Sequence, residues 1–240
     1  FAGLPAGTYF VKTNMGQGRL DEVYNDILCV GCTASGGTPI VLAAGEARTG
    51  IDFALGLGGR ITGRITDAAG NPLASGQAGF VGVSVFNAGG AFVSSASTNS
   101  AGVFLTSAGL PNGTYFVASS NSLGYINTLY NGISCVNCFA PSGTGVPVTV
   151  GNTTAGIDLV LTPGGRISGN VKTSDGAGGF IPVANAQVQV YSSSGSFVSS
   201  ATTNSAGNYA VVGLATNNYF VKTGNGVGFI DELFANAICV

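Results

Sequence analysis

GIDFALGLGGRITGRI, from Gly50 to Ile65, decides the fold because the chain contains it twice. It returns as GIDLVLTPGGRISGNV, from Gly156 to Val171. Apolar residues alternate with polar or small ones on each side of a glycine pair, and this alternation is typical of half-buried β-strands. A strand, a short glycine-rich connection and a second strand therefore recur about 105 residues apart.

Other segments recur with nearly the same spacing. FVSSASTNSAG, at Phe92–Gly102, returns as FVSSATTNSAG at Phe197–Gly207. GLPAGTYFVKT, at Gly3–Thr13, returns at Gly109–Ser119 and again at Gly213–Thr223. A period of about 105 residues is the size of a domain rather than of a solenoid turn.

The period predicts one complete repeat flanked by two incomplete ones. We expect residues 1–56 to be the C-terminal part of one repeat, 57–162 a complete repeat, and 163–240 the N-terminal part of a third. The linkers LGLGG and LTPGG are short, so neighbouring domains should abut.

Short alternating segments separated by turn residues fill the complete repeat. Turn signals this frequent favour an antiparallel β-sandwich. The predicted fold is therefore all-β, with tandem antiparallel sandwich domains (Ig-like or transthyretin-like) of about 105 residues. The expected strands are Arg60–Thr66, Val81–Phe86, Phe92–Ser97, Val103–Thr106, Thr114–Ser119, Ile157–Leu161 and, with weaker signals, Tyr125–Tyr130 and Pro147–Val150.

The segments GRITGRITDAAGNPL, VGVSVFN, TNSAGVF and GLPNGTYFV together resemble the carboxypeptidase regulatory-like domain. The resemblance covers Gly59–Val117 well and Gly165–Val221 less well, because the third repeat has ATNNY in place of LPxGxY. It implies a transthyretin-like sandwich found as tandem modules in bacterial surface and secreted proteins. Members of that family are mostly non-catalytic spacers, adhesive modules or binding modules.

Composition argues against several functional classes. Only 8% of the 240 residues are charged, the net charge is −2, and histidine and tryptophan are absent. No basic stripe is available for nucleic acid, and no apolar run reaches the roughly 18 residues of a membrane helix. Without histidine a Ser–His–Asp site cannot form. We expect no catalysis and no cofactor in this segment.

A cysteine motif recurs in each repeat. It reads YNDILCVGC at Tyr24–Cys32, YNGISCVNC at Tyr130–Cys138 and FANAIC at Phe234–Cys239. The histidine of a c-type haem motif is missing. A zinc site would need ligands from two domains or two molecules, and a thioredoxin-like centre would need a βαβ setting.

A structural disulfide within each loop is the favoured interpretation, because cysteines three apart in a turn bring their Cα atoms to about 5–6 Å. We therefore predict the pairs Cys29–Cys32 and Cys135–Cys138, with the partner of Cys239 beyond the chain end. Bonding between neighbouring repeats or molecules is the alternative. Either pairing implies an oxidising, extracytosolic location.

The carboxylates do not suggest a metal site. Asp21 and Glu22 match Asp231 and Glu232, but the middle repeat has Asn127–Thr128 there. Calcium needs about six oxygen ligands, several of them charged, so capping or solvated carboxylates are expected instead. Asp52 and Asp158, which recur in Gly-Ile-Asp, are expected to satisfy turn amides.

These observations predict a structural segment of an extracellular fibre or cell-surface stalk that self-associates through end-to-end sandwich domains. Sparse surface charge favours association of the chain with its own kind. The alternative is an adhesin or a carbohydrate-binding or spacer module of a secreted protein. That alternative predicts an exposed aromatic cluster, which Tyr125, Tyr130 and Phe139 could supply.

The incomplete repeats raise one further expectation. Part-domains would expose unpaired strand edges, which invite pairing with another chain, so strand donation between molecules is conceivable. The simpler interpretation, which we favour at this stage, is that the 240 residues are a segment of a longer polypeptide.

Overall fold

The computed structural model describes residues 2–76, 78–135, 138–224, 228–235 and 237–238. They form two compact units, which we describe separately. Unit 1 comprises Phe1–Ser120, Leu129–Ile133 and Phe139–Val160, and unit 2 comprises Asn121–Thr128, Ser134–Cys138 and Leu161–Val240. Within the described residues, no helix has the length and apolar character needed to cross a membrane.

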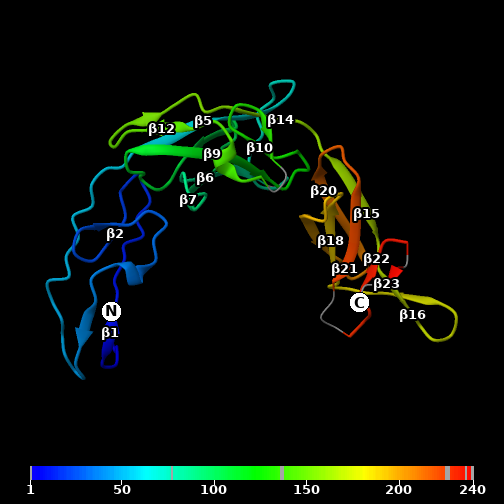
Figure 1. Cartoon of the computed structure of the whole chain (residues 1–240), viewed down its shortest axis with the longest axis horizontal. Helices are drawn as coiled ribbons and strands as arrows, with labels where there is room; N and C mark the ends of the chain where they lie inside the picture. Colours follow the sequence, from blue (N-terminus) through cyan, green and yellow to red (C-terminus); the bar gives the residue numbers. More distant parts are fainter. Residues whose placement is uncertain (1, 77, 136–137, 225–227, 236, 239–240) are drawn as a thin grey trace. The chain divides into compact units, whose positions relative to one another are not determined.

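Regular structure is almost entirely β, as the sequence predicts (Figure 1). The elements up to the second linker are β1 Gly7–Tyr9, β2 Glu22–Val23, β3 Ile27–Leu28, the 3-10 helix η1 Ala34–Gly36, β4 Ile40–Leu42, β5 Arg60–Asp67, β6 Val81–Phe86, β7 Phe92–Ser97, β8 Val103–Leu105, β9 Gly113–Asn121, β10 Thr128–Leu129, β11 Ile133–Ser134, the 3-10 helix η2 Ala140–Ser142, β12 Val146–Val148, β13 Thr153–Thr154 and β14 Leu159–Leu161.

Unit 1 contains the sandwich of the middle repeat. One sheet has the order β11-β10-β9-β6-β7, with β12 also paired to β9, and the other has the order β13-β5-β14, with β8 also paired to β5. Most pairings are antiparallel, but β13 runs parallel to β5. Apolar side chains from both sheets and their connections form the core and are at most 1% exposed: Ile61, Ile65, Val83, Phe104, Leu110 and Val117.

Residues 2–56, which the sequence predicts to be part of a first repeat, also belong to unit 1. Among them, β1 pairs with β4, so that Gly7 lies opposite Leu42. Strands β2 and β3 form a small hairpin. The segment from Ile51 to Leu55, which matches a strand of the middle repeat in sequence, forms no strand here.

Unit 2 contains the third repeat. Its elements are β15 Gly165–Asn170, β16 Lys172–Ser174, β17 Phe180–Pro182, β18 Gln187–Ser192, β19 Phe197–Thr202, β20 Asn208–Leu214, β21 Tyr219–Gly224, β22 Glu232–Leu233 and β23 Ala237–Ile238. One sheet has the order β19-β18-β21-β22-β23, β15 pairs with β20, and β16 pairs with β17. Val190, Val211 and Leu214 form its buried core.

The turns are stabilised by neutral and acidic side chains rather than by ion pairs. In each of six turns, one side-chain oxygen accepts hydrogen bonds from the backbone amides two and four residues further on, an arrangement that suits Asn and Asp. These residues are Asp67, Asn87, Asn99, Asn121, Asp175 and Asn204. The accepted hydrogen bonds also lower the pKa of Asp67, chiefly through Asn71.

A tyrosine fixes the start of the same strand in all three repeats. The hydroxyl of Tyr9 donates to the carbonyl of Pro5 at 2.8 Å, that of Tyr115 donates to Pro111 at 3.1 Å, and that of Tyr219 donates to Ala215 at 2.6 Å. This i to i−4 bond resembles the tyrosine corner of Ig-like sandwiches. Burial raises the pKa of the Tyr115 phenol.

Candidate functional site: cysteine loops and repeat joints

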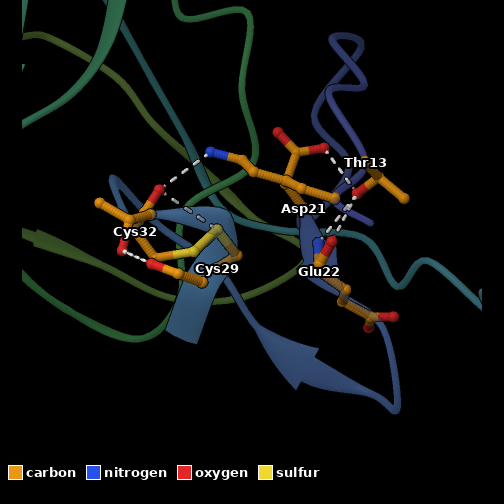
Figure 2. The surroundings of a disulfide bond; sticks show 8 residues. Thr13, Asp21, Glu22, Cys29 and Cys32 are labelled. Carbon is orange, nitrogen blue, oxygen red and sulfur yellow. Dashed lines mark hydrogen bonds between the residues drawn. A yellow bond between two sulfur atoms is a disulfide. The ribbon is translucent and has the colours of Figure 1, made fainter. Parts of the chain in front are cut away.

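Each cysteine pair closes a short loop. Cys29 and Cys32 form a disulfide with their Cα atoms 5.2 Å apart, and Cys135 and Cys138 form one with a Cα separation of 5.0 Å. Cys29 is only 2% exposed, so this half of the disulfide is buried. Figure 2 shows the disulfide and the side chains around it. Cys239 lies outside the described residues.

The cysteine loops are held by matching backbone hydrogen bonds. The Cys29 amide donates to the Asp21 carbonyl at 2.8 Å, and the Cys135 amide donates to the Asn127 carbonyl at 2.8 Å. In all three repeats, the backbone amide of the aromatic residue that begins the motif donates a hydrogen bond to a valine carbonyl. The pairs are Tyr24 to Val11, Tyr130 to Val117 and Phe234 to Val221.

Asp21 organises the backbone beside the first loop. Its carboxylate accepts a hydrogen bond from the Thr13 hydroxyl at 3.1 Å (Figure 2). It accepts a second one from the Met15 amide at 2.7 Å. Lys12 Nζ donates to the Cys32 carbonyl at 3.2 Å. Asp21 thus caps one backbone amide and one hydroxyl group. Among the residues that the structure describes, no three His, Cys, Asp or Glu side chains gather into a cluster that could hold a metal ion.

Asp158 has a different partner from the one predicted. Its carboxylate accepts a hydrogen bond from the Arg64 amide at 2.8 Å. That amide belongs to strand β5 rather than to a turn, so the expectation that Asp158 satisfies turn amides is wrong. The sequence did not reveal this contact because Asp158 and Arg64 are far apart in the chain. They meet only when the Gly-Ile-Asp segment comes back to β5 in the folded sandwich.

Both cysteine loops lie against the next repeat. A Cβ atom on Gly31, between Cys29 and Cys32, would be 2.9 Å from the Phe92 carbonyl oxygen, where β7 begins. In unit 2, Cys135 lines a shallow cavity together with Val198 and Ser199 of β19. Because β19 is the counterpart of β7 in sequence, the two cysteine loops meet equivalent strands.

The linkers make the same backbone contacts at both repeat joints. In unit 1 the Gly58 amide donates to the Gly18 carbonyl at 2.8 Å, and the Leu20 amide donates to the Gly56 carbonyl at 3.0 Å. In unit 2 the Gly164 amide donates to the Gly124 carbonyl at 2.9 Å, and the Ile126 amide donates to the Thr162 carbonyl at 2.9 Å. We call these two sets of contacts the repeat joints.

Close backbone packing explains the glycines of the joints. A Cβ atom on Gly58 would lie 2.5 Å from Gly109 Cα, and one on Gly109 would lie 2.5 Å from the Gly18 carbonyl oxygen. At the other joint, a Cβ atom on Gly164 would lie 2.5 Å from Gly213 Cα. Only glycine fits such an approach, so each joint is a specific contact rather than a loose tether.

The three aromatic residues that could supply an exposed cluster differ in exposure. Phe139 is 62% exposed and lies over the turn at Gly90, where an added Cβ atom would meet its ring. Tyr125 and Tyr130 are half-buried, and Tyr125 lies at the joint of unit 2, where it pairs with Pro163.

Comparison with known proteins gives similarity to solved structures alone. No family model matches the chain, so the resemblance to the carboxypeptidase regulatory-like domain stays a prediction. No curated protein sequence matches either.

The solved structures similar to the chain include three bacterial proteins. The Bacillus anthracis TIE protein matches at 20% identity and a TM-score of 0.31, over 73% of this chain and 30% of its own. The streptococcal ancillary pilin matches at 16% identity and a TM-score of 0.34, over 99% of this chain and 72% of its own. The shaft pilin spaA from Lactobacillus rhamnosus GG matches at 12% identity and a TM-score of 0.29, over 75% of this chain and 94% of its own. The match thus spans less than a third of the length of the TIE protein.

The joints are a structural feature that sequence reasoning missed. The glycines recur in the sequence, but Gly18, Gly58 and Gly109 are far apart along the chain. The sequence offered one sign of them, because the same three glycines recur one repeat later as Gly124, Gly164 and Gly213. Recurring glycines by themselves indicate turns and do not show that the glycines contact one another.

Proposed function

We propose that this chain is a structural segment of an extracellular fibre or cell-surface stalk, in which β-sandwich repeats abut through glycine joints. The single observation that carries the proposal is the joint itself, made twice with the same linker hydrogen bonds. A flexible tether would not need the same backbone contact at both joints. A load-bearing or spacing role needs this contact, because it opposes bending between neighbouring repeats.

The cysteine loops support the same role. A disulfide in so short a loop restricts the loop more than it restricts the whole chain. Because each loop lies against the next repeat, we infer that the disulfides stiffen the joint. Disulfides persist outside the reducing cytosol, which supports an extracellular or cell-surface location.

Surface chemistry supports self-association. In the described residues the one ion pair within 4.0 Å joins Arg48 to Glu46, at 3.6 Å, and it is exposed. The third repeat bears exposed apolar side chains, including Phe180 at 72%, Phe220 at 57% and Ile230 at 71%. Apolar side chains exposed to water favour association, because their burial against another surface is favourable.

Electron microscopy of the native material, with and without reductant, tests the proposal. We expect uniform fibres with a beaded repeat of a few nanometres under both conditions, because the predicted disulfides lie within loops. Fibres that dissociate on reduction would show that the cysteines form cross-links between chains. Dispersed particles in both conditions would contradict the fibre and leave a monomeric spacer or binding array.

The loop disulfides carry a separate prediction. Alkylation of native material before reduction should leave Cys29, Cys32, Cys135 and Cys138 unlabelled in the mass spectrum. The double variant Cys135→Ser/Cys138→Ser should lower the free energy of unfolding by no more than about 2 kcal/mol, since the closed loop is short. Labelled thiols at all four positions would contradict the disulfides, and a much larger loss would show that they do more than close a loop.

A further inference from the structure

The middle repeat begins and ends on neighbouring strands of one sheet. It begins with β5, which directly follows the first linker, and it ends with residues 152–161, which lead into the second linker. We call residues 152–161 the closing segment; it contains β13 and β14, and both are bonded to β5. Tension along the chain therefore enters the repeat at the start of β5 and leaves it at the end of the closing segment.

The closing segment runs parallel to β5. Its strand β13 pairs with β5 in parallel, with Thr154 opposite Ile61, and the Arg60 amide donates to the Asn152 carbonyl at 2.9 Å. The starts of two parallel strands lie at the same end of the pair. Tension on the start of β5 and on the end of the closing segment therefore slides one strand along the other, so that the bonds between them are loaded together.

Bonds continue along the second half of β5. The Ile157 amide donates to the Thr62 carbonyl at 3.2 Å, and the Arg64 amide donates to the Asp158 carboxylate at 2.8 Å. Between these two bonds the backbones are in close contact, because a Cβ atom on Gly63 would clash with the Ile157 carbonyl. The contact between β5 and the closing segment thus extends over most of the strand.

The opposite edge of β5 is also held. Along it β8 pairs antiparallel, with Gly63 opposite Phe104. Beyond β8, the Ile61 amide donates to the Thr106 hydroxyl at 3.0 Å, and the Thr106 amide donates back to the Ile61 carbonyl at 3.0 Å. The Arg60 guanidinium adds a bond from Nε to the Thr106 carbonyl at 2.7 Å. Because β5 is bonded along both edges, it cannot swing away from the closing segment without breaking further bonds.

Apolar side chains on both strands keep water from these bonds. Ile61 and Ile65 of β5 and Ile157 and Leu159 of the closing segment are at most 4% exposed. A hydrogen bond beside a buried apolar layer is stronger than one in water, and breaking it leaves polar groups without a partner. Sliding the strands would also pull these side chains out of the core, so burial adds to the resistance.

We propose that β5 and the closing segment form a mechanical clamp, which resists tension along the chain by shear. This inference rests on the proposed structural role, and it names the part of the repeat that carries the load. Forced unfolding is governed by the rate of unfolding rather than by equilibrium stability. The clamp therefore slows the extension of a repeat under tension, which is a property distinct from the stiffness of the repeat joints.

The first test compares two pulling directions on the 240-residue chain by single-molecule force spectroscopy, without reductant. Handles are attached through introduced cysteines in the Cys239→Ser background. The pair Leu57→Cys and Thr162→Cys loads β5 and the closing segment in shear, whereas Leu57→Cys and Val150→Cys peels them apart from one end. We expect the unfolding force to be at least about twofold higher in shear, because the bonds of the parallel pair are then loaded together rather than one at a time.

The second test removes one bond of the clamp. Asp158→Ala takes away the acceptor of the Arg64 amide, and we expect it to raise the unfolding rate at a fixed shear force by about threefold or more. The matched control is Asn87→Ala, which removes the side-chain acceptor of the Gly89 and Ala91 amides in the β6–β7 turn, outside the clamp. Asn87→Ala should lower the equilibrium stability in urea but keep the unfolding rate under shear within about twofold of the parent, since its turn stays formed while the clamp breaks.

Equal unfolding forces in the two pulling directions would overturn the clamp, and so would an Asp158→Ala variant that unfolds under shear at the parent rate. An Asn87→Ala variant that unfolds under shear as fast as Asp158→Ala would also overturn it, because the resistance would then follow general stability. These results would leave the structural role intact, since that role depends on the fibres in native material. Dispersed native particles with a shear-resistant repeat would instead remove the fibre and keep the clamp.

Discussion

Replacing Phe104 with alanine is expected to lower the free energy of unfolding of unit 1 by about 3–5 kcal/mol. Phe104 lies on β8, is 1% exposed, and is the largest of the fully buried side chains. Its removal deletes buried apolar surface and leaves a cavity that the two sheets can close only in part. Urea unfolding followed by tyrosine fluorescence or circular dichroism measures the change.

The control for this substitution is Phe92→Ala on the neighbouring strand β7. Phe92 is 53% exposed and its ring contacts Phe86 at a centroid distance of 6.2 Å. We expect a loss of about 1 kcal/mol, in line with one exposed aromatic pair. Equal losses for the two variants would contradict the placement of Phe104 in the core.

Replacing Gly58 with alanine is expected to be the most damaging change at a repeat joint, at about 3 kcal/mol, the upper end of ordinary over-packing. The added Cβ atom would lie 2.5 Å from Gly109 Cα and 2.6 Å from the Leu110 nitrogen. These are backbone atoms, which cannot move away by rotating as a flexible side chain can. The linker would have to move, and the bond from the Gly58 amide to the Gly18 carbonyl would be lost.

Gly56→Ala, in the same linker, is the matched control. The nearest atom to its Cβ position is Leu20 Cδ1 at 3.9 Å, so its stability should stay within about 0.5 kcal/mol of the parent. Hydrogen exchange at the Gly58 and Leu20 amides gives a local readout, and it should rise in Gly58→Ala alone. A stable Gly58→Ala with protected amides would show that the joint is loose.

Strands with strong alternation were predicted well from sequence. Val81–Phe86 and Phe92–Ser97 coincide with β6 and β7, because the hairpin turn at Asn87 and the period-2 pattern act within a few residues. Tyr125–Tyr130 is reduced to Thr128–Leu129, since Tyr125 and Ile126 bond the second linker instead. A tertiary contact there overrides a weak local preference.

The sequence by itself determined the all-β class, the period of the repeat, and the loops in which the cysteines lie. Each of these depends on residues close together in the chain, whose alternation and turn chemistry are local. Tertiary structure alone decided what lies on each side of β5, that Asp158 bonds Arg64, and that Gly18, Gly58 and Gly109 meet. Such contacts join distant segments, and their geometry exists only after the sheets have closed, so no local pattern in the sequence encodes it.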